Sequence, residues 1–233
     1  SMKILGERGD PPPYFLAYQV TEAQQVDIEA SFGALVDSDE DHWRMLDVDL
    51  RVGDHRLDNT RTLRDDDFFS RWRRSSSWAR MPIDADADAL RAVLWKTTDE
   101  AYRKAVENFV KVQVDKAVKV AREDDADDFS KESPSTFVQV PATLDVDRAT
   151  WEERIRRYSA LFQQHPDIHA SQVSLATVAE TRQFASSEGS AVQVARTHAR
   201  LSISASTTAE DGMELSRYES LDATTVEELP TDA

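Results

Sequence analysis

The alternation of apolar and polar residues in the first quarter of the sequence constrains the fold most strongly. Apolar residues occupy every second position over 26–36 and again over 46–52, with mostly acidic or polar residues between them. A period of two places one set of side chains on each face of a strand, one face buried and the other in water. We therefore predict an antiparallel meander of about three strands, with turns at 21–23 and 37–41.

This parity also predicts which side chains are buried. We expect the even-numbered apolar residues of 26–52 to point into the core, with Phe32 and Leu50 as the clearest cases. The strands should end at Gly53–Asp54. Residues 54–82, which are largely polar, then predict a long loop.

Two later segments have the periodicity of helices. Apolar residues over 90–112 recur at spacings of three, four and seven, so we predict a long helix that begins after Pro82 and ends near Glu123. Thr150 and Glu153 fit a capping box, with Thr150 as the N-cap of a second helix. That helix should end at His165–Pro166, because the residue before proline avoids the α conformation.

Period two returns in the last third of the chain. Strands are predicted between 173 and 221, separated by turns at 186–189 and 211–212. The apolar parity changes between Ala195 and His198, which predicts a bulge or strand break there. The order of strands then helix, followed by helix then strands, indicates an α+β fold with antiparallel or mixed sheets and two main helices.

The domain organisation follows from changes in composition. Three consecutive prolines at 11–13 indicate an extended lead-in. We expect one α+β domain with two halves, because an acidic run interrupts all periodicity after the first long helix. The predicted boundaries are 1–13 for the lead-in, 14–222 for the domain, 14–122 and 137–222 for its halves, 123–136 for the acidic linker, and 223–233 for a tail without core residues.

The composition argues against several classes of function. The net charge of -16 disfavours direct nucleic-acid binding, which normally needs a basic surface. A basic cluster at 71–74, near Trp78, is more typical of a solvated loop than of a binding patch. No apolar run approaches the roughly 20 residues of a membrane-spanning helix. The absence of Cys excludes disulfides and thiolate metal sites.

No catalytic signature occurs in the sequence. His-Glu-x-x-His, a glycine-rich phosphate loop and Gly-x-Ser-x-Gly are all absent. His165 and His169 have a metal-compatible spacing, but Pro166 between them disfavours a shared helical face. Asp47 and Asp49 lie on the predicted wet face of a strand, and we interpret them as solvated charges.

Several short segments together resemble a known family. They are YFLAY at 14–18, ASFGAL at 30–35, VDLRVGD at 48–54, LDNT at 57–60, LWKTTDEAY at 94–102, DFS at 128–130, ETR at 180–182 and SSEG at 186–189. This set, which spreads over nearly the whole chain, resembles the N-terminal region of TldD/PmbA-type proteins. These bacterial proteins are described as modulators of DNA gyrase and as related to metallopeptidases.

The resemblance implies a role without catalysis for this chain. Active members bind their metal through a His-Glu-x-x-x-His-type helix and a Cys in a C-terminal domain, and neither feature occurs here. We therefore expect an N-terminal domain cut off before a C-terminal catalytic-type domain. The chain itself should hold no cofactor and have no peptidase activity, and zinc would belong to the missing domain.

The resemblance also implies partners. The family forms homodimers or pairs with a paralogous subunit, and it processes unstructured peptides, so we expect this chain to help form the peptide cavity and the subunit contacts. We expect a cytoplasmic protein; export stays open, because Ser1–Met2 resembles a cloning remnant before a native Lys3. The alternatives are an acidic regulatory module that acts without proteolysis and, least favoured, a complete small enzyme.

Candidate contact residues come from the turns and from the parity change. Asp58, Asn59 and Thr60 follow a strand end, and the turn at 186–189 adjoins the predicted edge strand 190–206. An edge strand has unpaired backbone groups that another extended chain can join. The candidates for peptide or partner contact are Asp58, Asn59, Thr60, Ser187, Glu188, Gly189 and Arg196.

Overall fold

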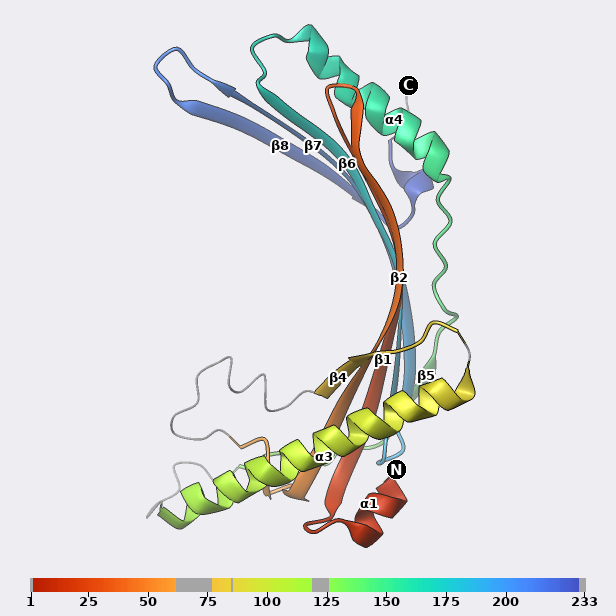
Figure 1. The fold of residues 1–233 in the computed structure, drawn as a ribbon, viewed down its shortest axis with the longest axis vertical. Helices are drawn as coiled ribbons and strands as arrows, with labels where there is room; N and C mark the ends of the chain where they lie inside the picture. Colours follow the sequence, from red (N-terminus) through yellow and green to blue (C-terminus); the bar gives the residue numbers. More distant parts are fainter. Residues whose placement is uncertain (1, 62–76, 85, 119–125, 231–233) are drawn as a thin grey trace. The chain divides into compact units, whose positions relative to one another are not determined.

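The computed structural model describes residues 2–61, 77–84, 86–118 and 126–230 (Figure 1). They fold into an α+β structure with one eight-stranded sheet. In chain order the elements are α1 (Met2–Arg8), β1 (Pro13–Ser31), β2 (Ala34–Asp54), β3 (Leu57–Asp58), β4 (Ser77–Arg80), α3 (Ala87–Val118), β5 (Thr136–Val138), α4 (Arg148–Ala160), the 3-10 turn η1 (Leu161–Gln164), β6 (Ala170–Ser186), β7 (Ala191–Thr208), β8 (Glu214–Ala223) and η2 (Val226–Glu228).

The sheet is built from four long strands and several short ones. Its order is β3-β2-β1-β6-β7-β5, with β4 paired to β2 and β8 paired to β7. The chain divides into two compact units. Unit 1 contains residues 1–21, 44–139 and 182–194, and unit 2 contains 22–43, 140–181 and 195–233. These units cut across the two sequence halves 14–122 and 137–222.

The first hairpin corrects the predicted meander. β1 runs without a break through 21–23 and β2 through 37–41, so the turns predicted there are wrong. The hairpin turns at Phe32 and Gly33, which have φ values of 45° and 79°. Two consecutive positive φ values are typical of the two-residue turns that connect twisted strands. Phe32 is only half-buried, so its predicted place in the core is wrong.

The parity prediction is confirmed for 26–30 and 46–52, but it is wrong just after this turn, where Val36 is 59% exposed and Leu35 packs on the core of unit 2. Val26, Ile28 and Ala30 are buried in unit 2. In unit 1 the even-numbered residues from Leu46 to Val52 are all buried. The alternation therefore predicted the buried face correctly for 26–30 and 46–52, and it predicted the start of β2 and the number of strands incorrectly.

In unit 1, α3 packs its apolar stripe on the sheet. Asp86 caps the helix, because its Oδ1 accepts hydrogen bonds from the backbone N–H groups of Asp88 and Ala89 at 2.9 and 3.3 Å. Ala101 and Ala105 are buried against Leu46 and its neighbours on β2, as the spacing predicted. The N-terminal segment is the helix α1 rather than an extended lead-in, and its Met2 and Leu5 pack on this core.

In unit 2, α4 lies over the sheet with Trp151 and Ile155 buried beneath it. Its N-cap is Asp147, not the predicted Thr150, since the Asp147 side chain accepts from the Thr150 N–H. The tail is also not free of core residues: Val226 and Leu229 are 6% and 3% exposed and belong to the same core.

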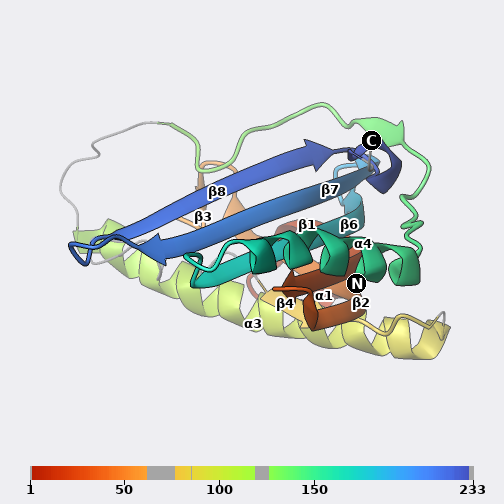
Figure 2. The same ribbon diagram turned by 90° about the horizontal axis from the view of Figure 1, so that it is seen from above.

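Strand β7 is continuous from Ala191 to Thr208, so no strand break occurs between Ala195 and His198. β7 also lies inside the sheet, with β6 on one side and β5 and β8 on the other. The prediction that 190–206 forms an edge is therefore wrong. Within the described ranges β5 covers 191–193 of β7 and β8 covers 199–208, so these two strands form that edge (Figure 2).

Most of the predicted loop 54–82, including the basic cluster at 71–74, lies outside the described residues. Its last part forms β4, which pairs with β2 so that Arg80 lies opposite Met45. The connection is held by Arg44, whose backbone O accepts from Met81 N at 2.8 Å and whose Nη1 donates to Pro82 O at 2.9 Å. Among the described residues, no helix is long and apolar enough to cross a membrane.

The carboxylates of Asp27, Asp37 and Asp39 repel one another on the β1–β2 hairpin of unit 2. Burial first, and the charges of Asp39 and Asp37 second, raise the pKa of Asp27. A carboxyl whose pKa is raised by folding opposes folding once it is ionised, so the cost is present at pH 7. It is lost below about pH 4, where both states are protonated.

We expect Asp27→Asn to raise the free energy of unfolding at pH 7 by less than about 0.5 kcal/mol, because the residue is exposed and water screens its charge, with the gain vanishing toward pH 3. Urea titrations at both pH values measure the effect. Glu29→Gln removes the same charge from the same strand. An equal gain from that variant would attribute the effect to net charge rather than to the Asp27 position.

Candidate functional site

The most polar buried region of unit 1 is a cluster around Asp58, whose side chain is 0% exposed. Its Oδ2 accepts from Arg51 Nη1 at 3.0 Å and from the Tyr14 hydroxyl at 2.7 Å. Its Oδ1 accepts from both the N–H and the hydroxyl of Thr60, each at 2.7 Å. We call Tyr14, Asp49, Arg51, Asp58 and Thr60 the Asp58 cluster.

Local sequence explains how these groups meet. Asp49 and Arg51 are two apart on β2 and therefore share a face, and Arg51 Nη2 contacts Asp49 Oδ2 at 3.2 Å. Gly53, with φ of 106°, lets the chain turn back into β3; a Cβ there would lie 2.4 Å from Leu57 O. Asn59 then closes the turn, with its Oδ1 accepting from Val52 N at 2.7 Å.

The segment that follows α3 completes the cluster. The Phe129 ring lies under the Arg51 guanidinium, with 3.9 Å from Cζ to the ring centroid. Asp128 accepts from the Asp58 N–H and from Arg61 Nη1, each at 3.0 Å. The Asp128 side chain is only 12% exposed. Asp128, within the predicted acidic linker 123–136, is therefore part of the folded structure of unit 1; 123–125 lie outside the described residues.

The turn at 186–189 joins the same region. Ser187 exchanges hydrogen bonds with Leu16: its N–H donates to Leu16 O at 2.8 Å, and its hydroxyl oxygen accepts from Leu16 N at 3.0 Å. Glu188 Oε1 lies 3.3 Å from His55 Nε2. The His55 ring in turn packs on Tyr14 and Phe129, with centroid distances of 4.8 and 5.9 Å.

The structure thus brings most of the candidate residues together. Asp58, Asn59 and Thr60 meet Ser187 and Glu188 through His55 and Phe129, and Gly189 supplies the positive φ of the same turn. Arg196 does not join them. It lies in unit 2, where its Nε donates to Glu180 Oε1 at 3.0 Å and its side chain is 66% exposed.

The electrostatics of the Asp58 cluster follow from its burial. Burial, with the hydrogen bond to Asp58, raises the pKa of the Tyr14 hydroxyl, which stays neutral and donates. Burial also raises the pKa of Asp49, although the charge of Arg51 opposes that shift. Burial alone would lower the pKa of Arg51, but the carboxylates of Asp49 and Asp58 outweigh it and raise the value.

The cluster therefore fixes structure rather than presenting a reactive group. The carboxylate oxygens of Asp58 are occupied within unit 1, and Asp58 and Asn59 are 0% and 2% exposed. No described set of three His, Cys, Asp or Glu side chains could hold a metal ion. The sequence pattern missed Arg51, His55 and Phe129, and the only local signal was the shared parity of Asp49 and Arg51.

Unit 2 contains a different feature, an apolar pocket of about 460 Å³. It lies between the end of α4 with η1 and the strands β7 and β8. Its lining is Tyr158, Leu161, Phe162, His165, Leu201, Ile203, Leu221 and Pro230. Leu161 and Leu221 are 58% and 46% exposed at this surface. An apolar cavity of this size accepts an apolar ligand group rather than a metal or an anion.

Comparison with known proteins gives one family match. The sequence model of the PmbA/TldA metallopeptidase central domain matches residues 113–229, half of the chain. No curated protein matches. That model is named for a central domain, whereas the sequence segments resembled an N-terminal region; the placement of the whole chain as an N-terminal domain stays a prediction.

Two solved structures share the fold. TldE from Thermococcus kodakarensis has a TM-score of 0.52 and 9% identity, over 96% of this chain and 43% of its own. A protein described as a proposed modulator of DNA gyrase, from Bacteroides thetaiotaomicron, has a TM-score of 0.52 and 12% identity, over 98% of this chain and 46% of its own. The chain spans less than half the length of either, and identities this low show a shared fold alone.

Proposed function

Because the chain belongs to the PmbA/TldD metallopeptidase family, we propose that it is a non-catalytic part of such a protein. In this proposal it binds an unstructured peptide and makes contacts with a second subunit, either another copy or a related chain. The family name implies a metal ion, but the described residues offer no ligand set and the sequence has no Cys. We therefore propose that the metal, zinc by resemblance, is bound outside these residues.

The observation that carries the peptide-binding proposal is the apolar pocket of unit 2. Its volume of about 460 Å³ is large enough for an apolar side chain of a peptide. The exposed rim residues Leu161 and Leu221 would lose contact with water when that side chain enters, which favours binding. An unstructured peptide can present such a side chain without first unfolding.

The Asp58 cluster has a supporting role in this proposal. It contacts the chain around Phe129 through the Asp58 N–H and the Arg51 guanidinium. Leu16 and His55, which lie beside the cluster, contact the turn at 186–189. Asp58 and Asn59 are too buried to touch a peptide directly. Of the candidate contact residues, Ser187, Gly189 and Arg196 are exposed and available to a peptide or subunit.

A binding experiment tests the pocket. We expect an unstructured peptide with one central Phe to bind the chain, and the same peptide with Ser in its place not to bind. Leu161→Ser should weaken binding about tenfold, because it removes apolar surface worth roughly 1–2 kcal/mol. Val36→Ser is the matched control: Val36 is 59% exposed in unit 2 but does not line the pocket.

Amide chemical shifts in a nuclear magnetic resonance titration report both the affinity and the place of binding. Mass spectrometry of the recovered peptide, with and without added zinc, reports cleavage. Shifts away from 158–165 and 201–221, or equal affinities for the two variants, would contradict the pocket. Zinc-dependent cleavage by the chain would contradict the non-catalytic part of the proposal.

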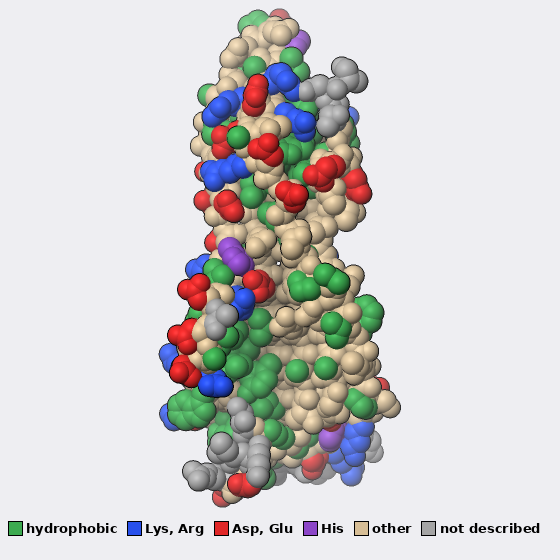
Figure 3. Space-filling view, turned by 90° about the vertical axis from the view of Figure 1, so that its right-hand side faces the viewer, with side chains coloured by type: hydrophobic (Ala, Val, Ile, Leu, Met, Phe, Trp, Pro, Cys, Tyr) green, Lys and Arg blue, Asp and Glu red, His purple; other side chains and the backbone are tan. Residues whose placement is uncertain are grey.

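The second candidate function is an acidic regulatory module that binds a basic partner. The observation that favours it is the net charge of -16. On the face shown in Figure 3, however, acidic and basic side chains are interspersed over unit 2 rather than gathered by sign. This function would be supported instead if the chain bound a Lys-rich peptide with an affinity that fell steeply with salt and that Leu161→Ser did not change.

A further inference from the structure

Strand β8 has a free edge. It pairs with β7 in a continuous antiparallel register from Ala199 opposite Ala223 to Thr208 opposite Glu214. No other strand of the described chain pairs with β8. Its unpaired N–H and C=O groups can therefore extend the sheet by one further strand.

The hairpin fixes which backbone groups face this edge. Ala209 N donates to Met213 O at 2.8 Å, so these two residues form a hydrogen-bonded pair. In an antiparallel ladder such pairs alternate along the strands, so the odd-numbered residues of β8 bond to β7. The even-numbered residues therefore direct their N–H and C=O groups to the free edge. They are Glu214, Ser216, Tyr218, Ser220 and Asp222.

We propose that β8 pairs antiparallel with β8 of a second copy of this chain, with Tyr218 opposite Tyr218. This register places even-numbered residues opposite even-numbered residues, so it uses the backbone groups that are free. It also places Arg217 opposite Glu219 of the second copy, twice by symmetry. Arg217 and Glu219 are 82% and 64% exposed, already contact each other within the strand, and can reach across.

The apolar side chains also match in this register. Leu215 comes to lie opposite Leu221 of the second copy, and these residues are 43% and 46% exposed in the single chain. Leu221 is opposite Leu201 on β7 and lines the pocket of unit 2. The second copy thus adds its Leu215 to the apolar row at the pocket rim. This register has one unfavourable pair: Glu214 lies opposite Asp222 of the second copy. By symmetry this pair of like charges occurs at both ends of the paired strands.

Neighbouring registers are disfavoured by charge. A centre one residue earlier places Arg217 opposite Arg217, and a centre one residue later places Glu219 opposite Glu219. Like charges directly opposite each other destabilise a strand pair. This charge pattern favours a second β8 in one register over an arbitrary extended segment. The inference specifies the subunit contact proposed above and rests on that part of the proposed function.

Charge reversal tests the register. We expect the 233-residue chain to form a concentration-dependent dimer in sedimentation velocity experiments. Arg217→Glu and Glu219→Arg should each weaken it about tenfold, because two opposite-charge pairs become like-charge pairs. The double variant with both changes restores opposite charges and should restore the dimer. Thermal melts of all three variants check that the exposed changes leave the fold intact.

Cross-linking gives an independent test, because the sequence has no Cys. Tyr218→Cys places two Cα atoms about 5.5 Å apart, within disulfide range, so oxidation should yield a covalent dimer. Ser216→Cys is the matched control: it lies on the same face, but its two copies are four residues out of register and should stay unlinked.

The outcomes separate this inference from the proposed function. If neither charge reversal weakens the dimer and position 218 does not cross-link, the β8 register is wrong. The proposed subunit contact would not be contradicted by this result. A chain that stays monomeric at all concentrations overturns this inference and the contact with another copy, and it leaves only a related chain as the second subunit. Peptide binding at the pocket is measured separately. A peptide that shifts the even-numbered amides of β8 in a monomeric chain would also overturn the inference, because the edge would then accept a peptide.

Discussion

Replacing Arg51 by Met is expected to lower the free energy of unfolding by about 3–5 kcal/mol. Arg51 is 15% exposed, and Asp58, which it pairs with at 3.0 Å, is 0% exposed. Without the guanidinium, Asp58 is left as a buried charge with no cation opposite it, and the Phe129 ring loses its cation–π contact. Met keeps much of the side-chain volume, so the change tests the charge more than the packing.

Arg103→Met on α3 is the matched control. Arg103 pairs with Asp99 at 2.8 Å, but its side chain is 77% exposed, and such helical surface pairs contribute about 0.3–0.5 kcal/mol. Urea unfolding followed by circular dichroism compares the two variants. Similar losses for both would show that the Asp58 cluster is open to water.

The second large effect is expected from Trp151→Ala. Trp151 is 3% exposed in the core of unit 2, and removing a buried aromatic side chain costs about 3–5 kcal/mol. Trp95→Ala is the matched control, since Trp95 is 68% exposed on α3 and should cost less than about 0.5 kcal/mol.

Hydrogen exchange measured amide by amide locates the loss from Trp151→Ala. Protection should fall first in 170–181 and 199–208, the segments of β6 and β7 that lie in unit 2. Protection lost to the same extent in the strand segments of unit 1 would show that the two units unfold together. A large effect from Trp95→Ala would show that its face of α3 is covered in solution.

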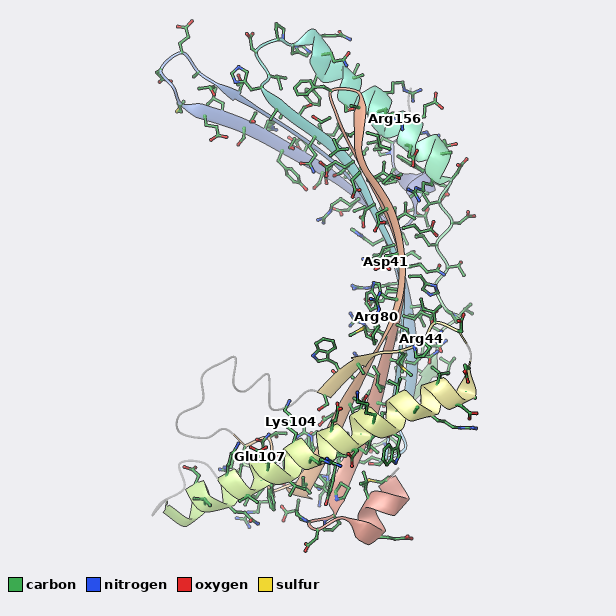
Figure 4. The ribbon with its side chains drawn as sticks, viewed as in Figure 1. Asp41, Arg44, Arg80, Lys104, Glu107 and Arg156 are labelled. Atoms are coloured by element: carbon green, nitrogen blue, oxygen red, sulfur yellow. The ribbon has the colours of Figure 1, made fainter. Side chains whose placement is uncertain are left out.

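The α+β class, the faces of most strands and the long helices could be predicted because they depend on local periodicity. The burial of 46–52 and the stripe on α3 are examples. Figure 4 labels two charged side chains of the same helix, Lys104 and Glu107. Glu107 belongs to the exposed face, where it accepts from Lys111 at 2.7 Å, and burial lowers the pKa of Lys104.

Strand number and edge position could not be predicted, because they depend on pairing between distant residues. Polar residues at 21–23 and 37–41 looked like turns but lie within long strands. Whether β7 or β8 forms the edge depends on which strand pairs last, and the parity of a single strand carries no such information. The burial of Val226 and Leu229 was not predicted, because two isolated apolar residues show no periodicity.

The Asp58 cluster was predictable only in part. Asp58, Asn59 and Thr60 were recognised as a turn after a strand, and 186–189 as a hairpin turn. Their meeting depends on His55 and Phe129, which are 133 and 59 positions from Glu188 along the chain. A single sequence contains no local pattern that links residues so far apart.

The neighbouring positions of β1 and β6 determine when this sheet can be assembled during synthesis. Thr177 of β6 donates to Val26 O of β1 at 2.9 Å, across 151 positions of the chain. A nascent chain that has only the first hairpin and α3 outside the ribosome therefore exposes one side of β1 to water. At about 5–20 residues per second, that strand waits several seconds for β6 to emerge. We expect a chaperone to protect the exposed edge of β1 mainly during this interval.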